Sequence, residues 1–517
     1  MVITSLQFLI FTAVSLLIYW KLPKRFQWML LLADSLVFYF VNCRAYTFLY
    51  VIGAVGAVYA ATCVFVRTRA KGAGEEERSQ RARKVALVLA LLSNLALLAV
   101  LKYSNLGIHT VNTIAQLGGG KRPLLHEVHF PAPLAISFYT LSLLSYLIDC
   151  YWGSAEPERN PLKVLLFTMY FPLMVSGPIS RYREIGGQLF EEHRFDYDRV
   201  ASGLRRAGWG FAKKCVVADR LSYLNDQLFL FPDIYSGIWV LGAAVLYSVQ
   251  LYFDFSGCMD IVLGISECFG IRLSENFKAP FFSVSIQEIW QRWHVALGSW
   301  LNDYLLYPLM KTKPMACLSE RLRKKYGKRG RHLATYPALL VLWSAMGLWH
   351  GDSWKYILGE GWWFFFVIVC GQLLAPVFAT WKKKLHIRET HPVWIAFQRC
   401  RTVLLFGIGM IFFRADSYPA ALHMLGRLFV PTGIVSPLRT LYYAAWEDFG
   451  GWPVLAAVVI LFVLQMMADA KVYRRESAQT KVKALHPVLR WSLYLALIFT
   501  TIFLGAYGRS SFIYFGF

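Results

Sequence analysis

The amino-acid sequence predicts an all-α polytopic membrane protein. Of its 517 residues, 57% are hydrophobic and 16% are aromatic, whereas only 16% are charged. Soluble domains usually carry about 25% charged residues, so this chain has more apolar surface than a water-soluble exterior can hide. Long apolar segments recur along the chain, and a helix needs roughly 20 such residues to cross a bilayer. These observations exclude a cytosolic globular enzyme, a disordered chain and a nucleic-acid-binding domain, and they make the lipid bilayer the expected surrounding.

We expect roughly eleven transmembrane helices, together with re-entrant and cytoplasmic interfacial elements. Nothing in the sequence marks a second domain, so residues 1–517 are expected to form one membrane domain. The segment Leu165–Val175 contains Pro172 and precedes Ser176-Gly177-Pro178, which favours a broken or re-entrant element. The apolar segments are Val2–Trp20, Trp28–Val41, Tyr46–Val66, Val85–Leu101, Pro131–Tyr151, Leu165–Val175, Ile238–Phe253, Tyr336–Trp349, Gly361–Trp381, Val403–Phe413, Trp452–Met467 and Trp491–Ala506.

Positive charge is in excess, with 54 Lys and Arg against 31 Asp and Glu. Basic residues of membrane proteins gather in cytoplasmic loops, where they set the orientation. The densest group lies in residues 311–331, a basic segment that we expect to be a cytoplasmic loop. Its charge suits either a topology signal or a docking surface for an acidic partner. The nine Cys are scattered without metal-ligand spacing, so neither a disulfide framework nor a metal site is expected.

Two histidines stand out as candidate catalytic residues. His350 closes the uncharged run Ala338–Trp349, and His294 lies in an apolar stripe at helical spacing from Ile286 to Leu301. Burial would keep such an imidazole neutral at pH 7, because desolvation disfavours the cation, and a neutral imidazole can act as a general base. The alternative is a histidine that only forms hydrogen bonds between helices. Glycines at 347 and 351 favour the functional interpretation for His350, because they permit close backbone approach.

Two further groups of polar residues are open to more than one interpretation. Asp254 and Asp260, near Gly257, suit a cation site in a transporter or a helix break whose carboxylates cap backbone amides, and we favour the second. Arg181 and Arg183, in the run Ser176–Arg183, suit phosphate binding or a position at the cytoplasmic interface. The sequence contains no GxSxG, P-loop or HExxH motif, so hydrolase, ATPase and metalloprotease functions have no support.

Several motifs, in this order along the chain, resemble segments of the membrane-bound O-acyltransferases, and most closely their bacterial branch that modifies alginate and teichoic acid. The resemblance covers most of the chain, from 102–107 to the aromatic end at 512–517. The motifs are Phe138–Asp149, Ser176–Tyr182 (SGPISRY), Gln250–Gly257 (QLYFDFSG), Glu275–Pro280 (ENFKAP), Trp290–His294 (WQRWH), Trp300–Tyr304 (WLNDY), Gly347–Gly351 (GLWHG) and Ile411–Ala415 (IFFRA).

The resemblance implies a ring-like arrangement of helices around a central tunnel. It places His350 at the family's catalytic histidine position and His294 at the second active-site position. Asn302 departs from the bacterial pattern, in which this position is usually Arg, so a charge contact there is in doubt. The substrate or tunnel residues that it implies are Asp303, Trp293, Trp349, Asn276, Asp254 and Arg181.

The resemblance also implies a function. The protein is expected to move an acetyl group from a cytoplasmic thioester donor, either acetyl-CoA or the phosphopantetheine of an acyl carrier protein, for O-acetylation of an extracytoplasmic polysaccharide. The expected partners are that donor or an acidic carrier at the cytoplasmic face and an SGNH-hydrolase-type acetyltransferase outside. No permanently bound cofactor is expected, and the expected location is the bacterial inner membrane.

Two alternatives stay open at this point. The first is D-alanyl transfer from a carrier protein to teichoic acid. The more distant one is a secondary transporter, which would require discontinuous half-helices in inverted repeats, and the sequence shows no such internal symmetry.

Overall fold

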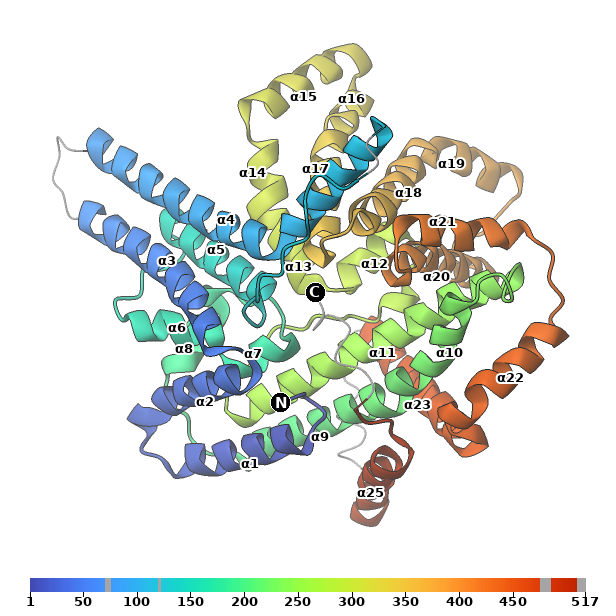
Figure 1. Cartoon of the computed structure of the whole chain (residues 1–517), viewed down its shortest axis with the longest axis horizontal. Helices are drawn as coiled ribbons and strands as arrows, with labels where there is room; N and C mark the ends of the chain where they lie inside the picture. Colours follow the sequence, from blue (N-terminus) through green and yellow to red (C-terminus); the bar gives the residue numbers. More distant parts are fainter. Residues whose placement is uncertain (70–75, 120–121, 475–484, 509–517) are drawn as a thin grey trace. The chain divides into compact units, whose positions relative to one another are not determined.

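A computed structural model describes residues 1–69, 76–119, 122–474 and 485–508, and over these ranges the chain is almost entirely helical (Figure 1). The β-type pairing found there is an isolated antiparallel bridge between Phe277 and Trp293. The predicted all-α fold is therefore confirmed. The aromatic carboxyl end at 512–517 lies outside the described residues.

Seven described helical segments are long and apolar enough to cross a membrane. Two shorter apolar segments, Leu6–Lys21 and Pro161–Ser176, add to them. These helices support a polytopic membrane protein, whereas the crossing number of roughly eleven and the central tunnel stay predictions. The seven candidate spans are Ala45–Thr68, Glu76–Leu117, Ile238–Cys268, Lys355–Leu373, Pro392–Arg414, Gly451–Tyr473 and Pro487–Leu504.

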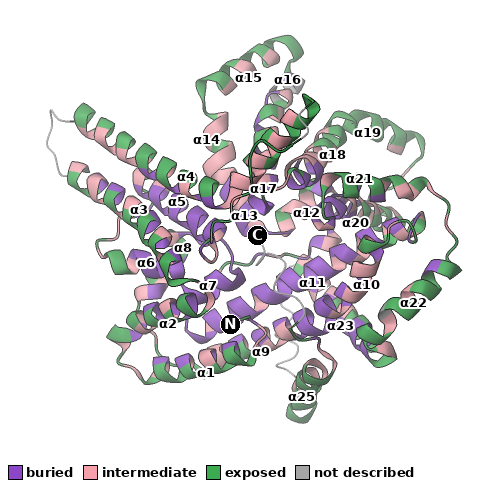
Figure 2. Cartoon of the chain, viewed as in Figure 1, coloured by how far each residue is buried: buried purple, intermediate pink, exposed green. Residues whose placement is uncertain are grey.

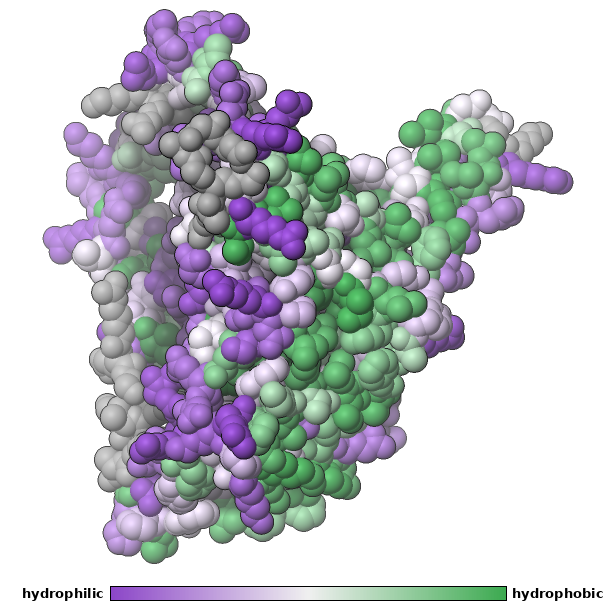
Figure 3. Space-filling model, turned by 90° about the vertical axis from the view of Figure 1, so that its left-hand side faces the viewer, coloured by the Kyte–Doolittle hydropathy of each residue, from purple (hydrophilic) through white to green (hydrophobic). Residues whose placement is uncertain are grey.

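Large apolar side chains form a broad continuous area on the face of the protein that Figure 3 shows. Among the residues that the first helices expose are Leu17 of α1 (Leu6–Lys21), Leu49 of α3 (Phe48–Arg69) and Leu89 of α4 (Glu76–Leu117). Exposing apolar surface to water costs about 25 cal/mol per Å², so an area of this extent requires a nonaqueous surrounding. Lipid supplies it.

The described helices gather into two compact units. The first combines Met1–Ala207 with Met259–Ser274, and the second combines Gly208–Cys258 with the residues from Glu275 onward. In the first unit, α5 (Ile136–Trp152) is buried along most of its length (Figure 2) and packs against α3 and α4.

Within the first unit, α9 (Tyr197–Ala212) and α11 (Ile238–Cys268) cross at two glycines. A Cβ on Gly203 would lie 2.4 Å from the carbonyl oxygen of Gly264, and a Cβ on Gly264 would lie as close to the carbonyl of Gly203. Only two glycines allow these backbones to touch. Close glycine contacts of this kind are typical of helices that pack inside membranes.

The broken element predicted around Pro172 is present. The chain forms α6 (Pro161–Met169), changes direction at Tyr170 and continues as α7 (Phe171–Ser176). A buried break leaves backbone amides without helical partners, and the amide of Phe171 donates to the Ser35 hydroxyl of α2 (Gln27–Asn42) at 3.0 Å. The helix α8 (Tyr182–Phe190) follows.

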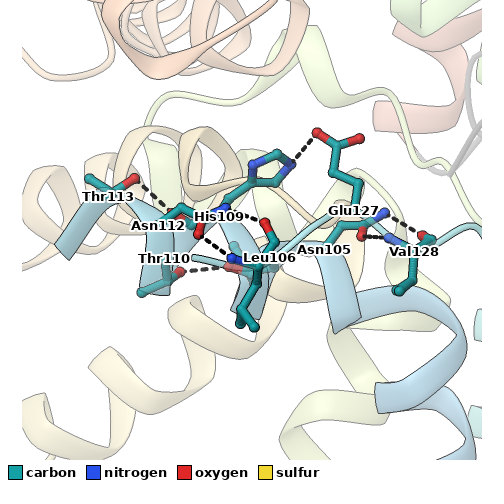
Figure 4. A network of polar contacts seen from close by, with 9 residues as sticks. Asn105, Leu106, His109, Thr110, Asn112, Thr113, Glu127 and Val128 are labelled. Atoms are coloured by element: carbon teal, nitrogen blue, oxygen red, sulfur yellow. Dashed lines mark hydrogen bonds and ion pairs between the residues drawn. The ribbon is translucent and has the colours of Figure 1, made fainter. Parts of the chain in front are cut away.

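The helix α4 is far longer than the predicted segment Val85–Leu101, because it continues for 42 residues. At 1.5 Å per residue it extends about 60 Å, roughly twice the thickness of a bilayer core. Its polar end binds the extended segment that follows it (Figure 4). The Asn105 amide donates to the carbonyl of Val128 at 2.9 Å and accepts from its N–H at 3.0 Å, and Asn112 holds the Leu125 backbone in the same way.

The predicted helix break near Asp254 is wrong, because α11 runs without interruption through Gly257. Gly257 instead serves helix contact, since an added Cβ would lie 3.0 Å from the carbonyl oxygen of Gly210. The Asp254 carboxylate forms an ion pair with Lys214 rather than capping an amide. Asp260, in the first unit, pairs with Arg206 at 2.9 Å.

Lys214 lies between two buried carboxylates in the second unit. Its ammonium is 2.6 Å from an oxygen of Asp254 and 2.6 Å from an oxygen of Asp219, which begins α10 (Asp219–Leu230). Burial disfavours the charged ammonium, but Asp254 and Asp219 outweigh it and raise the pKa of Lys214 above its ordinary value. The lysine thus ties the π-helical turn η3 (Lys213–Ala218) to α11.

The basic segment 311–331 is not a loop. It folds mainly into α15 (Lys313–Tyr326) and α16 (Lys328–Leu333), two adjacent helices that we call the basic hairpin (Figure 1). Only Glu320 supplies negative charge in 311–331, and it pairs with Lys324 on the solvent-exposed surface.

Other helices of the second unit are α14 (Tyr307–Met310), α18 (Trp362–Leu373), α19 (Ala375–Lys384), α20 (Pro392–Arg414), α21 (Tyr418–Gly426), α22 (Val435–Phe449), α23 (Gly451–Tyr473) and α25 (Pro487–Leu504).

The first prediction concerns the buried cation. Replacing Lys214→Met leaves two buried carboxylates without their shared cation, and removing one partner of a buried ion pair typically costs about 3–5 kcal/mol. The matched control is Lys324→Met, which breaks the exposed pair with Glu320, where we expect a loss below about 1 kcal/mol. Thermal unfolding in neutral detergent measures both. Similar, small changes in the two variants would contradict a stabilising role for Lys214.

Candidate active site

The candidate site begins with a break between two short helices, α12 (Ile286–Arg292) and α13 (Val295–Leu301). The apolar stripe predicts one continuous helix there, and this prediction is wrong. His294 has a φ of +48°, in the left-handed region, so the helix stops and restarts at this residue. The break is stabilised from outside, because the Asn276 side-chain oxygen accepts a hydrogen bond at 3.0 Å from the Ala296 amide in the first turn of α13.

Asn276 also reaches the imidazole of His294. Its side-chain oxygen lies 3.3 Å from Nδ1 of His294, whose ring is packed edge-on against Phe255 and Trp349. His294 is 1% exposed and lies outside the seven candidate spans. Burial lowers the pKa of His294 well below its ordinary value, and the nearby His350 lowers it further. The neutral imidazole is therefore the favoured form.

A second helix brings His350 to the same place. The helix α17 (Tyr336–His350) packs against the π-helical turn η6 (Lys355–Gly361) with almost no space between the backbones. A Cβ on Gly347 would lie 2.3 Å from the carbonyl oxygen of Tyr356, and a Cβ on Gly361 would lie 2.4 Å from that of Trp343. Glycine is required at both positions. The close backbone approach predicted at Gly347 is confirmed, whereas the sequence does not predict the one at Gly361.

This close contact places Glu360 against His350. One carboxylate oxygen of Glu360 is 2.8 Å from Nδ1 of the imidazole, and the two side chains are 1% and 2% exposed. The contact is a hydrogen bond from Nδ1–H when the imidazole is neutral and an ion pair when it is protonated. In either state the carboxylate fixes the orientation of the ring, with Nδ1 directed at Glu360.

Glu360 is not among the site residues that the sequence predicts. The signal was nevertheless present, because Glu360 is an acidic residue between two glycines, in an apolar segment ten positions after His350. Acidic residues in such segments are rare and usually have a partner or a function. A π-helical turn is a second signal, since these turns are frequent at functional sites, but only the structure reveals it.

The end of α20 fixes the other side of η6. The Lys355 ammonium donates to the carbonyl oxygens of Phe413 and Ala415, at 3.2 Å and 2.5 Å. A cation suits this position, because the last carbonyls of a helix lack helical partners and carry partial negative charge. The ring of Phe413 packs against the imidazole of His350 at the same time.

The predicted site residues divide into groups. His294, Asn276, Trp349 and His350 are brought together, because the indole of Trp349 contacts both imidazoles, with ring centroids 5.2 Å and 5.1 Å apart. Trp293 is buried nearby among aromatic rings that include Phe277 and Phe406.

The three remaining predicted residues lie in other settings. Asp303 is half-buried in the π-helical turn η5 (Asn302–Leu306). Asp254 is tied to Lys214, as described above. Arg181, buried and 3.9 Å from Glu184, belongs to the first compact unit.

The cluster is suited to acid–base chemistry. It holds two buried imidazoles, a carboxylate on one of them and aromatic walls that exclude water. Over the described residues no group of three His, Cys, Asp or Glu side chains is arranged to hold a metal ion. A neutral imidazole supported by a carboxylate can remove a proton from a hydroxyl group and return it to a leaving group.

Comparison with known proteins decides the family. The sequence pattern of the membrane-bound O-acyltransferases matches residues 35–413, which include both histidines and Glu360. The chain belongs to this family. The resemblance drawn from the motifs is thereby confirmed, and the protein is an acyltransferase of the membrane rather than a secondary transporter.

Relatives of this acyltransferase modify different polymers. It is 32% identical to a protein named probable alginate O-acetylase from Azotobacter vinelandii, over 87% of this chain and 79% of the relative. It is 30% identical to the peptidoglycan O-acetyltransferase of Helicobacter pylori, over 66% and 64%. It is 27% identical to the teichoic acid D-alanyltransferase of Bacillus subtilis, over 54% and 67%.

The second prediction concerns Glu360 as a positioning residue. Glu360→Gln keeps an oxygen that can accept from Nδ1–H but removes the negative charge that stabilises an imidazolium. If His350 is the catalytic base, kcat of acyl transfer should fall by about 10²-fold or more because the charge that supports it is lost, while the KM for donor stays within a factor of about two. Steady-state kinetics in neutral detergent measure both values.

The control for this variant is Glu447→Gln, the same change at an exposed position of α22, which should keep the wild-type kcat. Glu360→Asp retains the charge on a shorter side chain, so it should recover part of the lost kcat. Normal turnover in folded Glu360→Gln protein would show that the carboxylate has no part in the reaction.

Proposed function

We propose that this acyltransferase moves an acetyl group from a cytoplasmic thioester donor to an extracytoplasmic polysaccharide. The observation that carries the proposal is the buried pair of His350 and Glu360, 2.8 Å apart. The donor in this proposal is acetyl-CoA or an acyl carrier protein with phosphopantetheine. The protein would act in the bacterial inner membrane, together with an SGNH-hydrolase-type acetyltransferase outside.

The proposed reaction uses Nε2 of His350, the ring nitrogen that does not face Glu360. With Nδ1–H donating to Glu360, Nε2 has a lone pair and takes the proton of the acceptor hydroxyl while its oxygen attacks the thioester carbonyl. The new C–O bond forms, the C–S bond breaks, and the imidazolium returns the proton to the thiolate. The products are an O-ester and a free thiol. Glu360 stabilises the imidazolium between the two proton transfers.

His294 is proposed to position rather than to remove the proton. Its Nδ1 faces Asn276 and its ring contacts Trp349, which in turn contacts His350. Nδ1 of His294 thus faces an amide oxygen, whereas Nδ1 of His350 faces the carboxylate of Glu360. An amide oxygen orients the ring without adding negative charge, and burial disfavours the protonated form of His294, so its proposed role is to hold the indole and the donor in place.

The third prediction separates the two histidines. Asparagine tolerates the left-handed backbone of His294 and keeps hydrogen-bonding capacity, so His294→Asn should retain measurable acyl transfer. His350→Asn and His350→Ala should reduce transfer by about 10²–10⁴-fold, because general-base catalysis is lost. Acetyl content of the surface polysaccharide, at matched protein level, measures all three variants. An inactive His294→Asn protein beside an active His350→Asn protein would reverse the assignment.

The names of the relatives support a cell-envelope acceptor but differ in the acyl group and the polymer. Acetyl transfer is favoured because the relatives that align with more of this chain, from Azotobacter vinelandii and Helicobacter pylori, are named as O-acetylating proteins. The alternative is D-alanyl transfer from a carrier protein to teichoic acid, which the more distant relative favours. Supplying the purified protein with radiolabelled acetyl-CoA, acetyl carrier protein or D-alanyl carrier protein tests the donor directly.

The basic hairpin is proposed to attract the donor. The residues 311–331 carry nine Lys and Arg against the single acid Glu320, and Arg321, Arg323 and Lys325 of α15 are exposed. A topology signal needs only a few basic residues. Both proposed donors are anionic, through phosphates or through acidic side chains of a carrier, so long-range attraction would raise their local concentration.

The fourth prediction concerns this hairpin. Changing Arg321, Arg323 and Lys325 to Gln should raise the KM for donor and flatten its salt dependence, while kcat at saturating donor stays nearly constant because the chemistry lies elsewhere. Lys324 is kept, since it pairs with Glu320. The matched control changes Lys21, Lys24 and Arg25 to Gln, three basic residues at the end of α1 and in the turn that leads to α2. Neutral detergent removes anionic lipid from the assay. An unchanged KM and salt response would leave the hairpin only a topological or lipid-binding role.

A further inference from the structure

The helices α19 and α20, both in the second unit, follow one another along the chain (Figure 1). A cavity open to the surface lies at the turn between them. Its volume is about 640 Å³. One candidate span ends at Leu373 and the next begins at Pro392. The residues between them are therefore expected to lie at the membrane surface. The lining consists of His386, Ile387, Arg388, His391, Val393, Trp394 and Phe397.

The polar part of the lining consists of hydrogen-bond donors and positive charge. Arg388 is exposed and forms no ion pair with any residue that the structure describes, whereas the neighbouring acid Glu389 is neutralised by Lys382 at 2.6 Å. Nδ1 of His391 accepts from the amide of Val393 at 3.3 Å. The proton of the neutral ring is therefore on Nε2, which remains available as a donor.

The apolar part contains a buried donor without an acceptor. The indole N–H of Trp394 is buried and has no hydrogen-bond partner in the described structure. An indole nitrogen can only donate, and a buried donor without a partner costs stability, so a ligand oxygen is expected there. The ring of Trp394 stacks on that of Phe397 at 5.2 Å, and the two rings give the cavity an apolar wall.

The helix that precedes the cavity is suited to lie on a membrane surface. Val377, Phe378 and Trp381 of α19 are exposed, and the helix ends in the basic run Lys382–Lys384. Aromatic and basic residues in this arrangement are typical of interfacial helices. Basic residues beside a span indicate the cytoplasmic leaflet, where anionic lipids are concentrated.

From these observations we propose that the cavity at the α19–α20 turn binds the headgroup of an anionic phospholipid. Arg388 and Nε2–H of His391 contact the phosphate, the Trp394 N–H donates to a phosphate or ester oxygen, and an acyl chain follows the rings of Trp394 and Phe397. The site is independent of acyl transfer and contains none of the residues assigned to the reaction.

The test uses the full-length protein, purified and delipidated in neutral detergent. Binding of phosphatidylglycerol is measured by native mass spectrometry and by the shift in thermal unfolding, with phosphatidylcholine, inorganic phosphate and coenzyme A as the other ligands. We expect phosphatidylglycerol to bind and to stabilise the protein. Arg388→Gln and Trp394→Phe, which keeps the ring but removes the N–H, should each weaken binding by about tenfold.

The control is the double change Lys383→Gln and Lys384→Gln, which removes two exposed charges that do not line the cavity and should preserve binding. Gel filtration confirms that each variant is folded. Equal binding of phosphatidylcholine, equal losses in the control, or displacement of the lipid by inorganic phosphate or coenzyme A would each overturn the proposal.

Discussion

The backbone contact between α17 and η6 is the constraint on which the candidate site depends. Gly347 and Gly361 each face a carbonyl oxygen of the other element, at distances that no side chain could occupy. A larger residue at either position would separate the two elements by the width of a methyl group or more. Glu360 would then move away from His350, and the 2.8 Å contact would be lost. Gly347 of the GLWHG motif and Gly361 of η6 therefore act through geometry, although neither takes part in chemistry.

Three buried charged side chains of this protein are each compensated by a partner of opposite charge or polarity. Lys214 is held by two carboxylates, Lys355 by the last carbonyls of α20, and Glu360 by an imidazole. The first two have a fixed partner of opposite charge or polarity, so they stabilise one structure. The pair of His350 and Glu360 differs, because its imidazole can gain and lose a proton while the carboxylate stays in place. Of these three arrangements, the pair of His350 and Glu360 is therefore the one suited to carry a proton through a reaction.

The sequence predicts the fold class and most helical segments, because apolar runs of sufficient length have one stable conformation in lipid. It fails where tertiary contacts override the local pattern. The apolar stripe through His294 reads as one helix, but the loop of Asn276 supplies the acceptor that stabilises a break. Gly257 and Asp254 suggest a helix break, but α9 packs against Gly257 and Lys214 neutralises the carboxylate of Asp254. Such contacts join residues far apart in the chain, and no local pattern reports them.

The same limit explains why the local pattern yields the two histidines, whereas their different roles are expected only from the family resemblance. Both imidazoles are buried and both contact Trp349. Residue type and spacing therefore do not distinguish one histidine from the other. Their supports distinguish them, since one faces an amide and the other a carboxylate. An amide oxygen orients an imidazole without adding charge, whereas a carboxylate also stabilises the protonated ring. The proton-accepting role of His350 and the positioning role of His294 are therefore proposed from the group that contacts Nδ1 of each ring.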